Sequence, residues 1–240
     1  MESKGILYLA IGELYKNHTL NGIKALRRLG YSENIRVITD VMNWESEELD
    51  FELILVPALK YRFSSRYYKT QLYQYAFDLT LFLDADTIPI SSIEEIWTFL
   101  EISDLAVSSD LHPNVSSVIE KSINEPERRK PEYDLMKKLQ LENEHYYNSG
   151  VILFKKNPQV EAFFYYWHLE WLRFLSEDQL AFVRALNLTS VKIKLLPSIW
   201  NQRPKAFSSL KEAIFSGVKI LHFLSRQREL MQEFGLDDLK

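Results

Sequence analysis

The segment Leu81–Ile90 reads LFLDADTIPI and tells more about the fold than any other stretch of the chain. Its apolar start predicts a buried β-strand, and Asp84 and Asp86 stand one residue apart where that strand ends. In an extended segment, residues i and i+2 face the same side, so the two carboxylates would lie together and repel each other. A divalent cation removes this repulsion, and Mg²⁺ or Mn²⁺ accepts one or two carboxylates together with substrate phosphates. The stretch therefore predicts a metal site that receives a phosphate ester or a diphosphate.

Short apolar runs alternate with segments of helical periodicity on both sides of this stretch. The alternation predicts an α/β fold with a mostly parallel central sheet flanked by helices. In such sheets the ligand crevice lies beyond the carboxyl ends of the strands, which is where the two aspartates fall. The expected strands are 5–11, 34–39, 52–57, 79–83, 104–108, 146–154, 192–196 and 218–223, and the expected helices are 14–29, 66–77, 91–100, 157–175 and 177–186.

Local signals add detail to this outline. Gly30 follows the first expected helix and is predicted to be the C′ residue that ends it. Ser92 and Glu95 form a capping-box pattern, which predicts the start of a helix. The segment 111–145 is polar and charged, and it predicts a helical excursion with two short helices. Two roles are open for this excursion: a solvated surface, or a part in binding a partner or an acceptor.

The composition limits the classes to which the protein can belong. With 240 residues, 46% of them hydrophobic, and no visible repeat or linker, residues 1–240 are expected to form one domain with a sizeable core. The 29 basic and 33 acidic residues are well mixed, so charge offers no case for nucleic-acid binding. The absence of cysteine excludes disulfides and thiolate metal sites. No signal peptide or membrane span is predicted, so a cytoplasmic protein is expected.

Further segments with recognisable features lie around LFLDADTIPI. They are GILYLAIGELY (5–15), SRYYKTQLYQY (65–75), YYNSGVILFKKN (146–157), EDQLAF (177–182), LPSIWNQRP (196–204) and ILHFLSRQR (220–228). Together, and in this order, they resemble the glycogenin-like glycosyltransferase family 8 over about residues 5–228, apart from the middle excursion. One short match would carry little weight, but the shared order of all of them makes the resemblance specific.

The resemblance implies a GT-A fold, which is Rossmann-like, and the activity of a glycosyltransferase. It implies a metal-dependent, retaining enzyme that transfers a hexose from a nucleotide-diphosphate sugar, with UDP-sugar as the expected donor. The implied cofactor is Mn²⁺, or Mg²⁺ in its place. The acceptor is left open as a sugar, a protein or a lipid-linked molecule, and oligomerisation is compatible with the sequence.

The resemblance also implies roles for individual residues. The implied metal ligands are Asp84, Asp86 and His222. The implied contacts to the donor sugar and its reacting carbon are Asn148, Ser149, Gly150, Asp178 and Gln179, of which Asn148, Asp178 and Gln179 form the catalytic set. The implied contacts to the nucleotide and its phosphates are Ala10, Ile11, Gly12, Tyr15, Asp40, Lys69, Ala85 and Arg228. Arg228 stands where the family has lysine, and Ser225 where it has glycine.

Two other classes remain as alternatives. Phosphatases of the haloacid dehalogenase type also place Asp-x-Asp after an apolar strand. They typically carry Thr or Val four residues after the first aspartate, and their motif lies close to the N-terminus. Here Ile88 occupies that position, and three expected strands precede the motif. The other alternative is a non-catalytic nucleotide-sugar-binding protein of the same fold.

Overall fold

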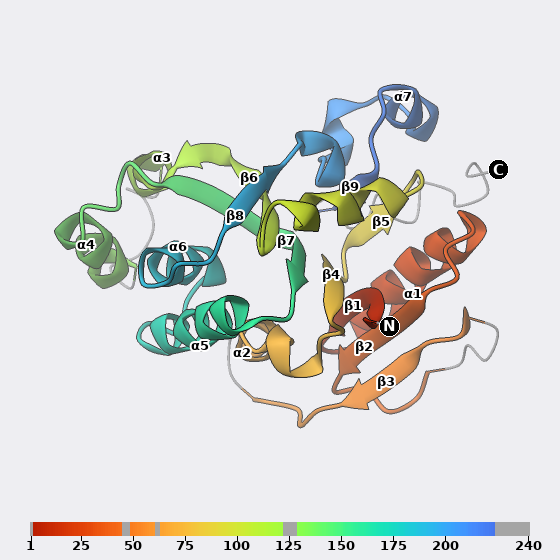
Figure 1. The fold of residues 1–240 in the computed structure, drawn as a ribbon, viewed down its shortest axis with the longest axis horizontal. Helices are drawn as coiled ribbons and strands as arrows, with labels where there is room; N and C mark the ends of the chain where they lie inside the picture. The colour runs from red at the N-terminus through yellow and green to blue at the C-terminus, as the bar shows by residue number, and fades with distance from the viewer. Residues whose placement is uncertain (1, 45–48, 61–62, 122–128, 224–240) are drawn as a thin grey trace.

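The computed structural model describes residues 2–44, 49–60, 63–121 and 129–223. Its main feature is a seven-stranded sheet with the order β3-β2-β1-β4-β7-β6-β8 (Figure 1). Its strands are β1 Lys4–Ala10, β2 Asn34–Thr39, β3 Glu52–Leu55, β4 Leu79–Asp84, β6 Leu105–Asn114, β7 His145–Lys155 and β8 Ile193–Leu196. β7 runs antiparallel to both of its neighbours, and the other neighbouring pairs are parallel. The expected α/β fold with a mostly parallel sheet is confirmed.

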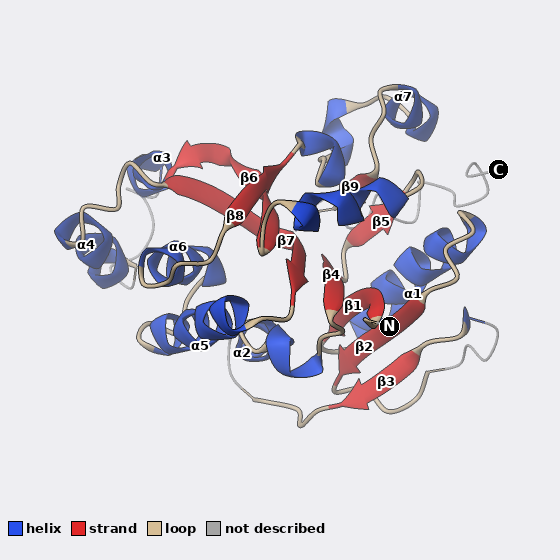
Figure 2. Cartoon of the chain, viewed as in Figure 1, coloured by secondary structure: helices blue, strands red, loops and turns tan. Residues whose placement is uncertain are grey.

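Helices flank this sheet (Figure 2). The α-helices are α1 Glu13–Arg28, α2 Ser64–Lys69, α3 Val115–Lys121, α4 Lys130–Lys138, α5 Pro158–Leu172, α6 Asp178–Asn187 and α7 Leu210–Phe215. Short 3₁₀ helices are η2 Leu72–Tyr75, η3 Glu94–Glu101, η5 Ser198–Trp200 and η6 Pro204–Ala206. Within the described ranges, none of the helices has the length and apolar character needed to cross a membrane.

The two faces of β1 pack into different buried clusters. Ile6, Tyr8 and Ala10 join residues of α1 in one cluster. Leu7 and Leu9 join residues of α5 and α6 in the other. Successive side chains of a strand point to opposite faces, so covering both faces favours an apolar side chain at every position from Ile6 to Ala10. This burial explains why the strand reads as a continuous apolar run.

The prediction made at Gly30 is confirmed at the end of α1. Gly30 has a φ of 82°. Its backbone N–H donates to the Arg27 carbonyl over 3.1 Å, and the N–H of Tyr31 donates to the Leu26 carbonyl over 3.0 Å. The two bonds form a Schellman motif, in which a residue with positive φ lets the chain turn back onto the last helical turn.

The helix expected over 66–77 is wrong as one continuous element. α2 ends at Lys69, and η2 follows as a separate 3₁₀ helix. The Thr70 hydroxyl donates to the carbonyl of Arg66 over 2.9 Å. A side chain that occupies a carbonyl of the last turn competes with the continuation of the helix, which accounts for the break.

Other boundaries shift by smaller amounts. The helix expected over 91–100 is the 3₁₀ helix η3, which begins at Glu94. The Ser92 hydroxyl accepts from the Glu94 backbone N–H over 3.4 Å, one residue earlier than the capping box predicts. The strand expected over 104–108 continues to Asn114 in β6, so the first residues of the expected excursion belong to the sheet.

The excursion contains the two expected short helices, α3 and α4, which lie at one end of the molecule (Figure 1). A buried ion triad attaches α4 to the core. Arg184 on α6 lies 2.9 Å from Glu132 on α4 and 2.7 Å from Glu170 on α5. Arg184 is 1% exposed and Glu132 is 2% exposed, so each charge depends on its partners rather than on water.

Replacing Arg184 with alanine should destabilise the protein by about 3–5 kcal/mol, because it leaves the buried Glu132 without its cation and Glu170 with Arg173 alone. Urea unfolding measures the change. Arg173→Ala is the matched control, since Arg173 also binds Glu170 but is 49% exposed, and it should cost less than about 1 kcal/mol. Equal losses for the two variants would show that the triad does not hold α4 in place.

Candidate active site

A cavity of about 550 Å³ opens at the carboxyl ends of β1 and β4. Ile11 lines it just beyond β1, and Asp84 lines it at the end of β4. β7 is antiparallel to β4, so its first half lies at the same edge and contributes Asn148, Ser149 and Gly150. The crevice expected at this edge is present, and a strand of opposite direction completes it.

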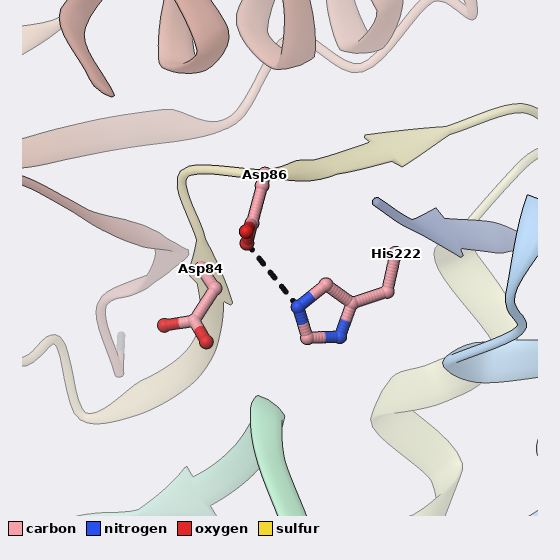
Figure 3. Close-up of side chains that lie close together, drawn as sticks. All are labelled: Asp84, Asp86 and His222. Carbon is pink, nitrogen blue, oxygen red and sulfur yellow. Dashed lines mark ion pairs between the residues drawn. The ribbon is translucent and has the colours of Figure 1, made fainter. Parts of the chain in front are cut away.

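Asp84 and Asp86 lie on a turn rather than in one extended strand. β4 ends at Asp84, Ala85 and Asp86 form the turn, and β5 (Thr87–Pro89) follows. The Thr87 hydroxyl donates to the Asp84 carbonyl over 2.7 Å and closes the turn. The expectation of an extended pair is therefore wrong at Asp86. The turn nevertheless brings both carboxylates to the same space (Figure 3).

His222 reaches this space through a second, two-stranded sheet. β9 (Ile220–His222) pairs antiparallel with β5, and His222 lies opposite Thr87. The backbone N–H of Phe223 donates to the Asp86 carbonyl over 2.8 Å. Ligand atoms of Asp84, Asp86 and His222 lie within 4.8 Å of one another (Figure 3). A strand as short as β5 has no periodicity to reveal it, and the sequence does not predict it.

A chain of hydrogen bonds determines which nitrogen of His222 carries a proton. The backbone N–H of Gly150 donates to Asn148 Oδ1 over 3.0 Å, which identifies that atom as the oxygen. Asn201 then donates its Nδ2 to the same oxygen over 3.0 Å and turns its own Oδ1 toward His222 Nδ1, at 2.9 Å. His222 Nδ1 therefore donates, and in the neutral ring Nε2 keeps a lone pair.

The surroundings of His222 Nε2 fit a bound cation. This atom is buried and has no hydrogen-bond partner among the described residues. It faces Asp86 Oδ1 at 3.2 Å (Figure 3). Two electron-pair donors at this distance need a proton or a metal ion between them, because burial leaves them little water. Two carboxylates and one imidazole nitrogen form a donor set that divalent cations accept.

Asn201→Ala should lower the affinity for Mn²⁺ by about 10–100-fold, because the imidazole loses the acceptor that orients it. The measurement is the electron paramagnetic resonance of free Mn²⁺ during a titration without any sugar nucleotide. Asn187→Ala, at the exposed end of α6, is the matched control. If the Asn201 variant binds Mn²⁺ as tightly as the control does, Asn201 does not position His222.

Lys69, the last residue of α2, lies between two carboxylates of the cavity. Its Nζ is 2.8 Å from Asp84 Oδ2 and 3.7 Å from Asp178 Oδ2. Burial alone would lower the pKa of Lys69, but the two carboxylates raise it above its ordinary value, so the side chain stays charged. Burial raises the pKa of Asp84, with Lys69 opposing the rise and Asp86 adding to it.

Asp178 is the first residue of α6 and lines the same cavity. Burial alone would raise its pKa, but Lys69, Arg66 and the Ser149 hydroxyl lower it below its ordinary value. The Ser149 hydroxyl donates to Asp178 Oδ2 over 2.6 Å, and Arg66 Nε lies 3.6 Å from Oδ1. Asp178 is thus an ionised carboxylate held from both sides, at a helix N-terminus that also favours negative charge.

The structure brings most of the expected site residues to this cavity. Those that line it are Ile11, Tyr15, Lys69, Asp84, Ala85, Asp86, Asn148, Ser149, Gly150, Asp178, Gln179 and His222. Ala10 is fully buried in the core instead, so its side chain is not available to a nucleotide. Gly12 and Asp40 lie beside the cavity wall, where the Gly12 N–H donates to Asp40 Oδ1 over 2.7 Å. Arg228 lies outside the described residues.

Sequence reasoning misses several residues of the cavity wall. They include Arg66, Asp110, His112, Arg129, Tyr146, Glu177 and Arg203. Arg66 stands three residues before Lys69 on α2, and helical spacing was a usable signal for it. Arg66 and Arg129 both bind Glu177, at 2.8 and 3.0 Å, which connects the excursion to the cavity. Asp110 and Arg203 carry no local signal, because chain segments distant in sequence place them here.

Comparisons with known proteins identify the family through a family model and the fold through solved structures. The family model described as Glycosyl transferase family 8 matches residues 20–227. The galactosyltransferase LgtC, solved in complex with donor and acceptor sugar analogs, is 17% identical with a TM-score of 0.59, and 95% of each chain is covered. Mouse xyloside xylosyltransferase 1 is 12% identical with a TM-score of 0.55, covering 94% of this chain and 99% of its own.

The glycosyltransferase GlyE of Streptococcus pneumoniae TIGR4 is similar as well, at 14% identity and a TM-score of 0.59. The match covers 100% of this chain and 62% of the GlyE chain. Among curated protein sequences, none matches this chain significantly. At these identities the three structures report a shared fold, and the family model reports the family.

Proposed function

The chain belongs to glycosyl transferase family 8, and we propose that this GT-A glycosyltransferase moves a hexose from a nucleotide-diphosphate sugar to an acceptor. The proposed reaction depends on a divalent ion, Mn²⁺ or Mg²⁺, and retains the anomeric configuration. UDP-sugar is the proposed donor. Residues 1–240 are proposed to work as one domain, which the span of the family match supports. The donor and acceptor sugar analogs of the LgtC structure support two sugar subsites on this fold.

The set of Asp84, which is half-buried, with Asp86 and His222, which are buried, is the observation that carries the proposal. These three side chains would hold the ion, which when bound would offset the negative charge that develops on the departing diphosphate. Asn201 prepares His222 for this role by accepting its Nδ1 proton. Lys69 already offsets the charge of Asp84, but the buried Asp86 carboxylate faces the lone pair of His222 Nε2 at 3.2 Å, and this contact favours a metal role over a structural one.

Lys69, Ile11 and Tyr15 are proposed to bind the nucleotide part of the donor. The Lys69 ammonium already lies against the carboxylate of Asp84 and can form charge-assisted hydrogen bonds to phosphate oxygens next to it. Ile11 and Tyr15 line the cavity just beyond β1, where an apolar and an aromatic side chain suit a base or ribose face.

Asp178, Asn148 and Gln179 are proposed to contact the donor sugar. Asp178 is ionised and held by Lys69 and Ser149, so it can stabilise positive charge that develops at the anomeric carbon. Ser149 and Lys69 occupy its Oδ2, and Arg66 lies 3.6 Å from its Oδ1, so both oxygens that a nucleophile would need are engaged. We therefore favour departure and attack on one face of the sugar, with the leaving phosphate accepting the proton of the acceptor hydroxyl.

The test is a panel of UDP-, GDP- and ADP-linked hexoses with Mn²⁺, read first as melting temperature and then as nucleotide release in water. A donor at a hundredfold excess over its dissociation constant stabilises the folded state by about 2.7 kcal/mol. For a chain of this length the shift is about 5–10 °C. Chelation of the metal should abolish both signals.

The two readouts separate the proposed enzyme from its alternatives. A thermal shift without slow nucleotide release would indicate a binding protein of the same fold. No metal-dependent shift with any donor would refute the donor proposal. Cleavage of simple phosphate monoesters through a phosphoaspartate at Asp84 would show that the protein is a phosphatase of the haloacid dehalogenase type.

A further inference from the structure

A second cavity, of about 450 Å³, adjoins the donor cavity. The two share the wall residues Asp110, Asn148, Arg203 and His222. The remaining wall of the second cavity is largely apolar and includes Leu111, which is 67% exposed. The second cavity begins at His222, one of the three proposed metal ligands. It is therefore placed to hold the acceptor, which is the molecule that attacks the donor sugar.

Arg203 lies at the junction of the two cavities and is half-buried. Within the described part of the chain, its guanidinium has neither a carboxylate at ion-pair distance nor a hydrogen-bond acceptor. The other cations of the donor cavity differ, because Lys69 is paired with Asp84, and Arg66 and Arg129 are paired with Glu177. Arg203 is thus a cation without an anionic partner among the described residues, and its guanidinium is available to an anionic ligand.

The backbone around Arg203 is held in place. The preceding Gln202 donates its N–H to Ile220 over 3.0 Å and accepts from the N–H of His222 over 2.8 Å. The following Pro204 is buried and begins η6. The guanidinium therefore projects from a rigid segment attached to the strand that carries His222, and rigid placement is what a recognition residue requires.

The other charged groups of the second cavity leave its potential positive. Lys205 is exposed and lines the cavity beside Arg203. Among the described residues, Asp110 is the one carboxylate of this wall, and internal donors occupy its oxygens. Its Oδ2 accepts from Asn148 over 3.1 Å and from Gln179 over 3.4 Å, and its Oδ1 accepts from the His112 N–H over 3.2 Å.

We propose that the acceptor is a sugar that carries an anionic group, a carboxylate or a phosphate, and that Arg203 with Lys205 selects it. The guanidinium fork matches both anions with two parallel hydrogen bonds. The apolar wall at Leu111 receives the carbon face of the sugar, and its free hydroxyl points past Asn148 toward the donor. This inference rests on the proposed function, because it assigns the second substrate of the same reaction.

The test compares glucose with glucuronic acid and with glucose 6-phosphate, and the matching galactose set, as ligands of protein loaded with UDP and Mn²⁺. These sugars differ only at C6, so titration calorimetry isolates the charged group and separates carboxylate from phosphate. At least one charged sugar should bind about 10-fold tighter than its neutral partner, since charge-assisted hydrogen bonds are of that strength. Arg203→Gln should remove the difference. Lys211→Gln, on the exposed surface of α7, makes the same change of charge and should preserve it.

Equal binding of charged and neutral sugars, or no binding of any charged sugar, overturns the acceptor inference. It is also overturned if Arg203→Gln weakens UDP binding by the same factor, because the guanidinium then serves the donor diphosphate. Failure of UDP and Mn²⁺ to stabilise the wild-type protein is a different result. It refutes the proposed function, and the two failures are thereby told apart.

Discussion

Asp86→Ala should reduce metal-dependent turnover of the donor by at least about 100-fold while leaving the fold intact. Loss of a group that only orients a metal ligand costs about 10–100-fold, and Asp86 is itself one of the three candidate ligands. The variant should fold because it removes a buried carboxylate, 4% exposed, that raises the pKa of Asp84. Nucleotide release from the UDP-hexose that binds best, measured with Mn²⁺, reports the loss.

The control for this experiment is Asp134→Ala, which removes an exposed aspartate of α4. It should keep both full activity and full Mn²⁺ affinity. Urea unfolding of both variants shows whether the Asp86 variant is folded. Full Mn²⁺-dependent activity in the Asp86 variant would mean that the metal assignment is wrong.

Gly150→Ala should lower Mn²⁺ affinity by about 10–100-fold and stability by about 1–3 kcal/mol. A Cβ at this position would lie 2.2 Å from His222 Cε1 and 2.6 Å from Nδ1, too close for the ring to stay. His222 is 2% exposed and bound to Asn201, so it has little room in which to yield. Any shift of the ring moves Nε2 away from Asp84 and Asp86. Mn²⁺ titration and urea unfolding measure the two effects.

A double-mutant cycle identifies the cause of this loss. In a His222→Ala background the added methyl group finds space, so Gly150→Ala should cost little stability there. The coupling between the two substitutions should be of the size of the loss in the single variant. If the glycine substitution costs the same with and without the imidazole, the clash with His222 is not the reason that residue 150 is glycine.

Local patterns were sufficient for most of the fold. Strands buried on both faces appear as apolar runs, which is why β1, β2 and β4 lie where the sequence predicts them. Gly30 ends α1 through bonds between residues a few positions apart, and such bonds depend on the local sequence alone. The stretch LFLDADTIPI likewise predicts a strand that ends in two carboxylates at the carboxyl edge of the sheet. The family and the class of enzyme, which the resemblance of the separated segments predicts, are confirmed.

Local patterns did not predict the contacts between segments that are distant in the sequence. Periodicity shows which side of an element is buried, but it does not show which element lies opposite. The pairing of β5 with β9 brings His222 to Asp86, and the β4–β7 pairing brings Gly150 beneath the imidazole. The absence of a side chain at Gly150 thus makes room for the His222 ring.

The amino-acid sequence alone is enough to predict the α/β class, the position of Asp84 and Asp86 at a strand end, and the residue types available for a metal site. The tautomer of His222 follows from the folded chain and not from any local pattern, because the hydrogen bonds from Gly150 through Asn148 to Asn201 cross between separate elements. The tertiary structure also decided that Arg203 stands at the junction of two cavities, with no partner in the described ranges. Both features have one cause: hydrogen-bond geometry and desolvation depend on neighbours in space, and folding alone brings those neighbours together.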